Sequence, residues 1–264
     1  MKKHITIIFF VIISIIELKA QHLTHEIGAF FGSTSLQTDY GQKGNFATQW
    51  NNNAKTFSVA HYLSFYNKTL RWDPHDVLQN HLMVKTEIQY LNNADYQHYG
   101  KWVKKDSPSG EQLRAMKGSI RSLDFGVNVE CFLFPLEEFI YPYSDILFNP
   151  FFTLGLKYSF FTNTLTSDLG DWRQDISVLP TKYQLDNALD IGDGQAVALS
   201  FGIGTRFKLS PKIDLVAQST YQHFFSDTID GLQTPANLNQ NNDWSFNIQF
   251  GMVYHLNYEK PLFH

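Results

Sequence analysis

Cysteine, charge and long apolar runs are all scarce in this chain, and each scarcity narrows its class. A single cysteine among 264 residues excludes an intrachain disulfide. Charged residues make up 17%, below the roughly 25% of an average soluble domain. Beyond residue 20, no run is long and apolar enough to cross a bilayer as a helix. The net charge of -4 argues against a nucleic-acid partner.

Cofactor and metal motifs are missing as well. The ten histidines include no HExxH pair, and the Gly-Asp-Gly at 192–194 lacks the spacing of an EF-hand loop. Gly202-Ile203-Gly204 has neither the third glycine nor the strand–helix context of a dinucleotide site. We expect these inward glycines to make room for bulky neighbours, and we expect no cofactor and no metal.

The N-terminus has the layout of a secretory signal peptide. Basic Lys2 and Lys3 precede an apolar stretch from Ile5 to Ile16, which is too short to span a bilayer comfortably. Leu18-Lys19-Ala20 supplies a cleavage site. The expected parts are therefore a signal peptide over residues 1–20 and one barrel domain over residues 21–264.

Aromatic residues, in contrast, are abundant at 16%. From Trp244 to Leu256 every second residue is large and apolar, while most of those between are polar or small. Such alternation places the two sets on opposite faces of a strand. Trp and Tyr at the two ends are typical of a lipid-facing strand with aromatic girdles. Trp244 to Tyr254 covers about 23 Å of depth at a tilt of roughly 45°, close to the apolar band of an outer-membrane barrel.

Eight segments share this alternation. They are His25–Leu36, Phe57–Tyr66, His81–Leu91, Ser119–Phe134, Phe151–Phe160, Val197–Leu209, Ile213–Phe224 and Trp244–Leu256. The connectors after every odd segment are long and polar, as outer-membrane barrels require on their extracellular side. The sequence predicts an all-β fold, an eight-stranded antiparallel up-and-down transmembrane β-barrel in the outer membrane. A β-sandwich is the alternative, but it explains neither the aromatic band nor the low charge.

The inward faces carry four basic and four acidic side chains, namely Lys85, Glu87, Asp124, Glu130, Lys157, Arg206, Lys208 and Asp214. An eight-stranded barrel is only wide enough for side chains to fill it. Buried charges must then be paired, so we expect a salt-bridged plug. Arg206 and Glu130 are the expected partners, because Arg can chelate a carboxylate with two bonds. A small-solute pore is the alternative reading of the same charges.

Two outer loops carry opposite charge. The loop at 92–118 is basic and the loop at 161–196 is acidic, so they are candidates to pair with each other or to meet lipopolysaccharide phosphates and divalent ions. Large aromatics beside cations are the residue types that anchor interfaces. The loop residues proposed for interaction are Trp102, Lys104, Lys105, Trp172 and Tyr183.

One enzymatic alternative remains. His223, Ser226 and Asp227 lie within five residues at a strand rim, and some small outer-membrane barrels that modify lipid A have a His and a Ser near the rim. Short spacing does not by itself provide the geometry of a hydrolase triad.

The sequence also resembles a known family. The resemblance rests on His25–Gly32, Gly100–Val103, Leu113–Gly118, Phe207–Pro211, Phe225–Leu232 and Asn242–Trp244. These segments look like those of the PorG-type barrels of Bacteroidota, which are associated with the type IX secretion system. The resemblance covers most of the mature chain and implies an outer-membrane component or accessory rather than an enzyme.

We therefore expect a non-enzymatic outer-membrane barrel that is a structural or accessory part of an envelope complex, with protein secretion as the indicated process. The expected partners are outer-membrane lipid, lipopolysaccharide and proteins of that complex. A lipid A-modifying enzyme and a small-solute pore are the alternatives.

Overall fold

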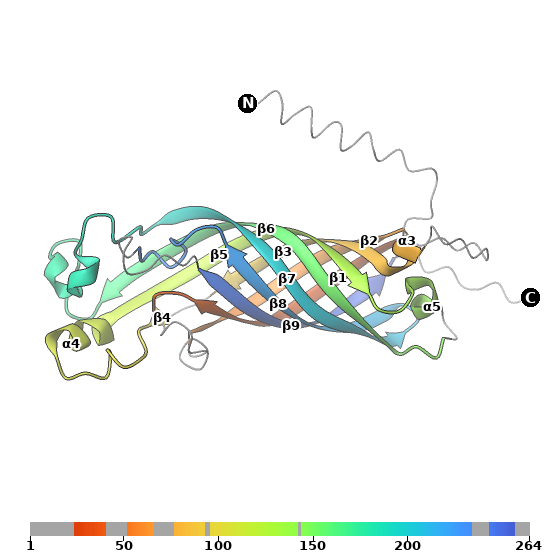
Figure 1. Cartoon of the computed structure of the whole chain (residues 1–264), viewed down its shortest axis with the longest axis horizontal. Helices are drawn as coiled ribbons and strands as arrows, with labels where there is room; N and C mark the ends of the chain where they lie inside the picture. The colour runs from red at the N-terminus through yellow and green to blue at the C-terminus, as the bar shows by residue number, and fades with distance from the viewer. Residues whose placement is uncertain are drawn as a thin grey trace, which may run out of the picture.

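The computed structural model describes residues 24–40, 52–65, 77–92, 96–141, 144–233 and 243–256 (Figure 1). Eight long strands form the wall: β1 (Thr24–Gln37), β2 (Asn53–Ser64), β3 (Leu82–Asn92), β5 (Met116–Phe132), β6 (Phe148–Ser167), β7 (Asp193–Ser210), β8 (Ile213–Phe224) and β9 (Trp244–His255). The predicted cleavage site after Ala20 falls outside the described residues.

The strands close into a barrel. Each pairs antiparallel with its neighbours in sequence, and β1 pairs with β9. β3 pairs directly with β5, since the two-residue β4 (Tyr96–Gln97) only extends the upper edge of β5. The predicted eight-stranded antiparallel barrel is confirmed. A sandwich is excluded, because the sheet closes on itself instead of packing against a second one.

Short helices lie at both ends. The end with the long connectors carries α4 (Pro108–Ala115), η2 (Ile176–Val178) and η3 (Thr181–Tyr183), and the other end carries α3 (Val77–His81) and α5 (Leu136–Ile140) (Figure 1). Long loops mark the extracellular end of such barrels, and we use that name for the end with α4.

No helix in the described part of the chain is long and apolar enough to cross a membrane.

The outer wall is apolar around its middle. Phe31 and Phe152 are 67% and 66% exposed, and other large apolar side chains surround the barrel in the same way. Each strand alternates between these exposed residues and buried ones, as in β5. A continuous exposed apolar belt is stable only against lipid, so the predicted transmembrane face is present.

Above this belt the pattern inverts. On β6 the outward residues beyond Phe160 are Thr162, Thr164 and Thr166, while Phe161 and Leu165 point inward and are buried. The strand continues to Ser167, seven residues past its predicted end. The prediction was too short because it followed outward apolar residues, whereas above the membrane water lies outside and the apolar face turns inward.

Of the two glycines of β7 predicted to make room for bulky neighbours, Gly204 has that role, whereas a Cβ on Gly202 would meet the backbone carbonyl oxygen of Ser219 at 2.3 Å. A Cβ on Gly204 would lie 2.3 Å from the ring of Phe151, which fills the lumen at that level. Phe151 belongs to an apolar cluster inside the barrel, toward the end opposite the extracellular loops, together with Phe30, Tyr62 and Phe132.

Candidate functional site

The centre of the lumen is held by one acidic and two basic side chains, which we call the plug. Both Lys85 Nζ and Lys157 Nζ lie 3.2 Å from the Glu87 carboxylate, and all three side chains are buried. Ser58 Oγ donates a 2.9 Å hydrogen bond to Glu87. A carboxylate paired twice and hydrogen-bonded once meets the requirement for a buried charge.

A second group of charged side chains, which we call the anchor cluster, lies nearer the end of the barrel opposite the extracellular loops. Arg206 Nη1 contacts Glu26 at 2.5 Å and Asp214 at 3.7 Å, and Arg206 Nη2 lies 3.7 Å from Glu130. His255 bridges Glu26 and Asp214 with two contacts of 2.9 Å. The expected Arg206–Glu130 pair is present but long, and Glu26 is the closest partner.

Two members of the anchor cluster were missed from the sequence. Glu26 and His255 each alternate along the strand with a lipid-facing neighbour, Ile27 and Tyr254. The strand alternation therefore already indicated that both side chains point into the lumen. Lys208, which was predicted to line the lumen, is instead partly exposed and donates to the carbonyl oxygen of Tyr141.

Amide side chains fill the space around the plug. Lys157 Nζ donates to Gln89 Oε1 at 3.1 Å, and Lys85 Nζ donates to Gln218 Oε1 at 3.2 Å. Gln218 in turn donates to Gln249 at 2.6 Å. The described lumen is therefore crossed by interlocking polar side chains, which suits a filled barrel better than an aqueous channel.

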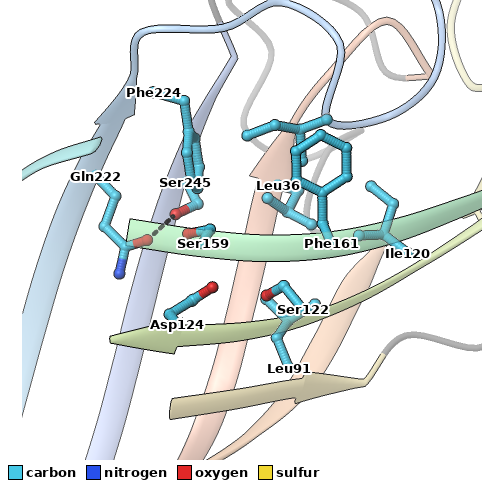
Figure 2. A pocket seen from close by; sticks show the side chains of 11 residues that line it. Leu36, Leu91, Ile120, Ser122, Asp124, Ser159, Phe161, Gln222, Phe224 and Ser245 are labelled. Atoms are coloured by element: carbon cyan, nitrogen blue, oxygen red, sulfur yellow. Dashed lines mark hydrogen bonds between the residues drawn. The ribbon is translucent and has the colours of Figure 1, made fainter. Parts of the chain in front are cut away.

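A small chamber lies inside the barrel, lined by inward side chains that include Asp124 and Phe161 (Figure 2). Apolar Leu36, Ile120 and Phe161 lie on one side of it, and Asp124, Ser159 and Gln222 lie on the other. Ser245 Oγ donates a 3.3 Å hydrogen bond to Gln222 Oε1.

The chamber holds three polar atoms without a hydrogen-bond partner among the described residues: Asp124 Oδ1, Ser159 Oγ and Gln222 Nε2. The space open to the centre of a water molecule is about 10 Å³, which is the lower limit for a single water. Asp124 lies in this chamber, outside the ion-paired plug. Its other oxygen accepts a 3.4 Å hydrogen bond from Gln89.

An apolar cap closes the barrel above the chamber. Its core includes Tyr40, Leu113 and Tyr183 from three different loops, together with the inward residues of the strand extensions. The His98 ring stacks on Tyr40 with centroids 4.6 Å apart and lies 5.9 Å from Tyr183. Burial, with Lys182 nearby, lowers the pKa of His98 to about 3, so this imidazole is neutral.

Two buried aspartates order the loop after β8, and one of them joins it to Asp39 of the loop after β1. Asp230 accepts backbone N–H bonds from Asp39 and Leu232, both at 2.8 Å, and Asp243 accepts one from Ile229 at 3.2 Å. Burial and the charge of Asp39 raise the pKa of Asp230 to about 8. Burial and the charge of Asp230 raise the pKa of Asp243 well above its ordinary value.

The predicted loop residues are distributed between the surface and the core of the cap. Trp102, Lys104 and Lys105 are exposed. Trp172 packs against the cap core, and its Nε1 donates to the carbonyl oxygen of Leu165 at 2.8 Å. Tyr183 is completely buried, which corrects its proposed role, because a side chain in the cap core offers a partner no contact area.

His223 and Ser226 have other neighbours at the strand rim. The Ser226 hydroxyl is within 3.0 Å of Thr228 Oγ1, and the His223 ring packs edge-on against Phe225. Within the described residues, no group of three or more His, Cys, Asp or Glu side chains is arranged to hold a metal ion.

Comparison with known proteins extends only to the fold. No family model and no curated protein matches the chain. Among solved structures, a major outer membrane protein from Thermus thermophilus is 11% identical with a TM-score of 0.46, and it matches over 89% of this chain and 100% of its own.

The attachment invasion locus protein Ail of Yersinia pestis is 11% identical with a TM-score of 0.43, over 89% of this chain and 99% of Ail. The outer membrane enzyme PagL is 11% identical with a TM-score of 0.37, over 86% and 97% of the two chains. The assignment of the barrel rests on the strand pairing described above.

Proposed function

We propose that this chain is a non-enzymatic outer-membrane barrel that acts as an accessory component of an envelope complex through its extracellular cap. The observation that supports this most is the contrast between lumen and loops. The lumen is filled by the plug and the anchor cluster, whereas the described parts of the loops form a cap whose surface carries an exposed tryptophan and clustered charges. On sequence resemblance, the complex would be a secretion assembly of the PorG type.

Co-purification tests this proposal. The tagged barrel is cross-linked in cells, extracted in detergent and analysed for recovered proteins. We expect specific proteins with the native chain and reduced recovery after Trp102→Ala combined with Trp172→Ala, with the barrel still folded by heat-modifiable gel mobility. The single replacements then assign the protein partner to one loop or the other. Unchanged recovery in the double variant would refute the role of the cap.

The lipid A-modifying alternative makes a separate prediction. If His223 or Ser226 is catalytic, replacing either by Ala changes the mass of lipid A in the host. The Ser226–Thr228 contact argues against that role in this conformation, so we expect the lipid A mass to stay constant. A shift in either variant would favour the enzyme.

A further inference from the structure

The turn before α4 concentrates exposed positive charge. We call residues 100–117 the basic lobe and residues 168–193 the acidic lobe. The basic lobe has five Lys or Arg and two acidic residues, whereas the acidic lobe has six Asp and two basic residues. Among the described residues, a single ion pair joins the two lobes, between Lys117 and Asp168 at 2.8 Å.

The three lysines of the turn keep their charge available. Lys101, Lys104 and Lys105 are exposed and make no ion pair with any described residue. Two of them gather around one indole ring, with Lys105 Nζ at 3.8 Å and Lys101 Nζ at 5.3 Å from the centroid of Trp102. Cation–π attraction holds these ammonium groups close together, and Trp102 is still 58% exposed.

The turn is held rigidly against the cap. Arg114, in the last turn of α4, donates from Nη1 to the carbonyl oxygens of Val103 at 2.6 Å and Lys105 at 3.1 Å. Val103 packs against the cap core. Gly110 allows the helix to approach, because a Cβ there would lie 2.2 Å from the Lys105 carbonyl oxygen. A pre-ordered cluster loses little conformational entropy on binding.

The height of the lobe separates it from lipid headgroups. The apolar belt ends at the Leu123–Phe160 pair. Met116, at the base of the lobe, is the first residue of β5 and lies seven residues from Leu123 toward the extracellular end. At a rise of about 3.3 Å per residue and roughly 45° of tilt, the lobe begins about 16 Å above the belt. The interfacial zone of a bilayer is only about 5–8 Å thick on each side.

The composition of the lobe differs from that of a protein-interface core. Lysine and aspartate are depleted in the cores of protein interfaces, but the residues next to Trp102 on this surface include three lysines and Asp106. The barrel is closed, so the wall offers no free strand edge for a peptide to extend. Clustered cations beside an exposed aromatic face fit a flexible anionic chain with apolar ring faces.

We propose that the basic lobe binds an anionic polysaccharide, with Lys101, Lys104 and Lys105 meeting its charged groups and Trp102 contacting its sugar rings. This inference rests on the proposed function in taking the cap as the contact surface, and it names the ligand class of one lobe.

Binding to purified protein tests the proposal. The full barrel is placed in nanodiscs of zwitterionic phospholipid, and binding of dextran sulfate, uncharged dextran and polyglutamate is measured by biolayer interferometry. We expect dextran sulfate to bind, more weakly at higher salt because exposed charges are screened, and dextran not to bind. Lys104→Gln with Lys105→Gln should weaken dextran sulfate binding at least tenfold, and Trp102→Ala by roughly five- to tenfold.

Matched controls come from elsewhere at the extracellular end. Arg173→Gln removes one exposed cation from the acidic lobe, and Phe225→Ala removes an aromatic residue that is 59% exposed. Neither should change binding more than twofold. Equal losses in the controls, no binding of dextran sulfate, or binding of polyglutamate that is as tight and as sensitive to Trp102→Ala would overturn the proposal.

The co-purification experiment remains independent of this result. If dextran sulfate does not bind while proteins are still recovered through the cap, the polysaccharide inference fails and the proposed function stands.

Discussion

Replacing Arg206 should destabilise the barrel more than any other single removal of charge. In Arg206→Gln, Glu26, Glu130 and Asp214 lose the guanidinium that lies within 2.5 to 3.7 Å of them, and His255 alone remains to pair two of the three. The guanidinium also lies 4.5 Å from the centroid of Tyr62. Removing one partner of a buried ion pair costs about 3–5 kcal/mol, and here one guanidinium contacts three carboxylates.

The measurement is urea unfolding of the barrel in phospholipid vesicles, followed by gel mobility and tryptophan fluorescence. Lys208→Gln is the matched control on the same strand, because it removes a cation that is partly exposed and that, among the described residues, donates to a carbonyl oxygen and lies over a ring. We expect that control to stay within about 1 kcal/mol of the native chain. Adding Glu26→Gln to Arg206→Gln should recover part of the loss, as coupled neighbours do. An Arg206→Gln variant as stable as the control would refute the ion-pair account of the anchor cluster.

Three further predictions address the membrane, the export signal and the cap. Phe250→Arg should cost roughly 2–4 kcal/mol in vesicle unfolding, because Phe250 is 53% exposed on the lipid-facing wall, and Thr164→Arg, outward-facing above the belt on β6, should cost little; equal costs would mean the belt is misplaced. Mass spectrometry of the exported protein should find residues 1–20 removed, and a chain that retains Met1 would disprove the signal peptide. The cap should open more readily to protease as pH rises from 6.5 to 8, since Asp230 with a pKa of about 8 stays protonated in the folded cap while the unfolded carboxyl has already ionised. Asp243 acts in the same direction, and the slope is at most about 1.4 kcal/mol per pH unit for each group. Below pH 6.5 His98, whose pKa is lowered to about 3, opposes this trend because the unfolded imidazole gains a proton. Asp230→Asn should reduce the pH dependence, and an unchanged dependence would exclude that carboxyl as a source.

Alternation predicted which way most residues of the membrane-spanning wall face. It placed Lys85, Glu87 and Lys157 in the lumen, where the structure pairs them. It did not predict which charges meet, because pairing across the barrel depends on closure. Glu26 and His255 lie 229 residues apart and become direct neighbours only when β1 and β9 pair.

The loops could not be predicted in the same way because they lack a period. Tyr183 lies in a single 3₁₀ turn, and nothing in its immediate sequence distinguishes an exposed aromatic from a buried one. Its position is fixed by His98 and Lys182, which lie against its ring. Trp102 is exposed for an equally non-local reason, since Arg114 and Val103 hold its turn on the outside of the cap.

The inversion on β6 connects these observations. Around the plug and the anchor cluster the interior is polar and the exterior is apolar, whereas beyond Phe160 the inward Phe161 and Leu165 are apolar and the outward threonines are polar. The two faces exchange polarity because the solvent outside the strand changes from lipid to water. Burial favours apolar groups only where the outside is water. The cap is therefore built like a water-soluble domain on top of a membrane barrel. Its charged lobes are free to serve recognition, because the anchoring and the filling of the lumen are carried by the strands beneath it.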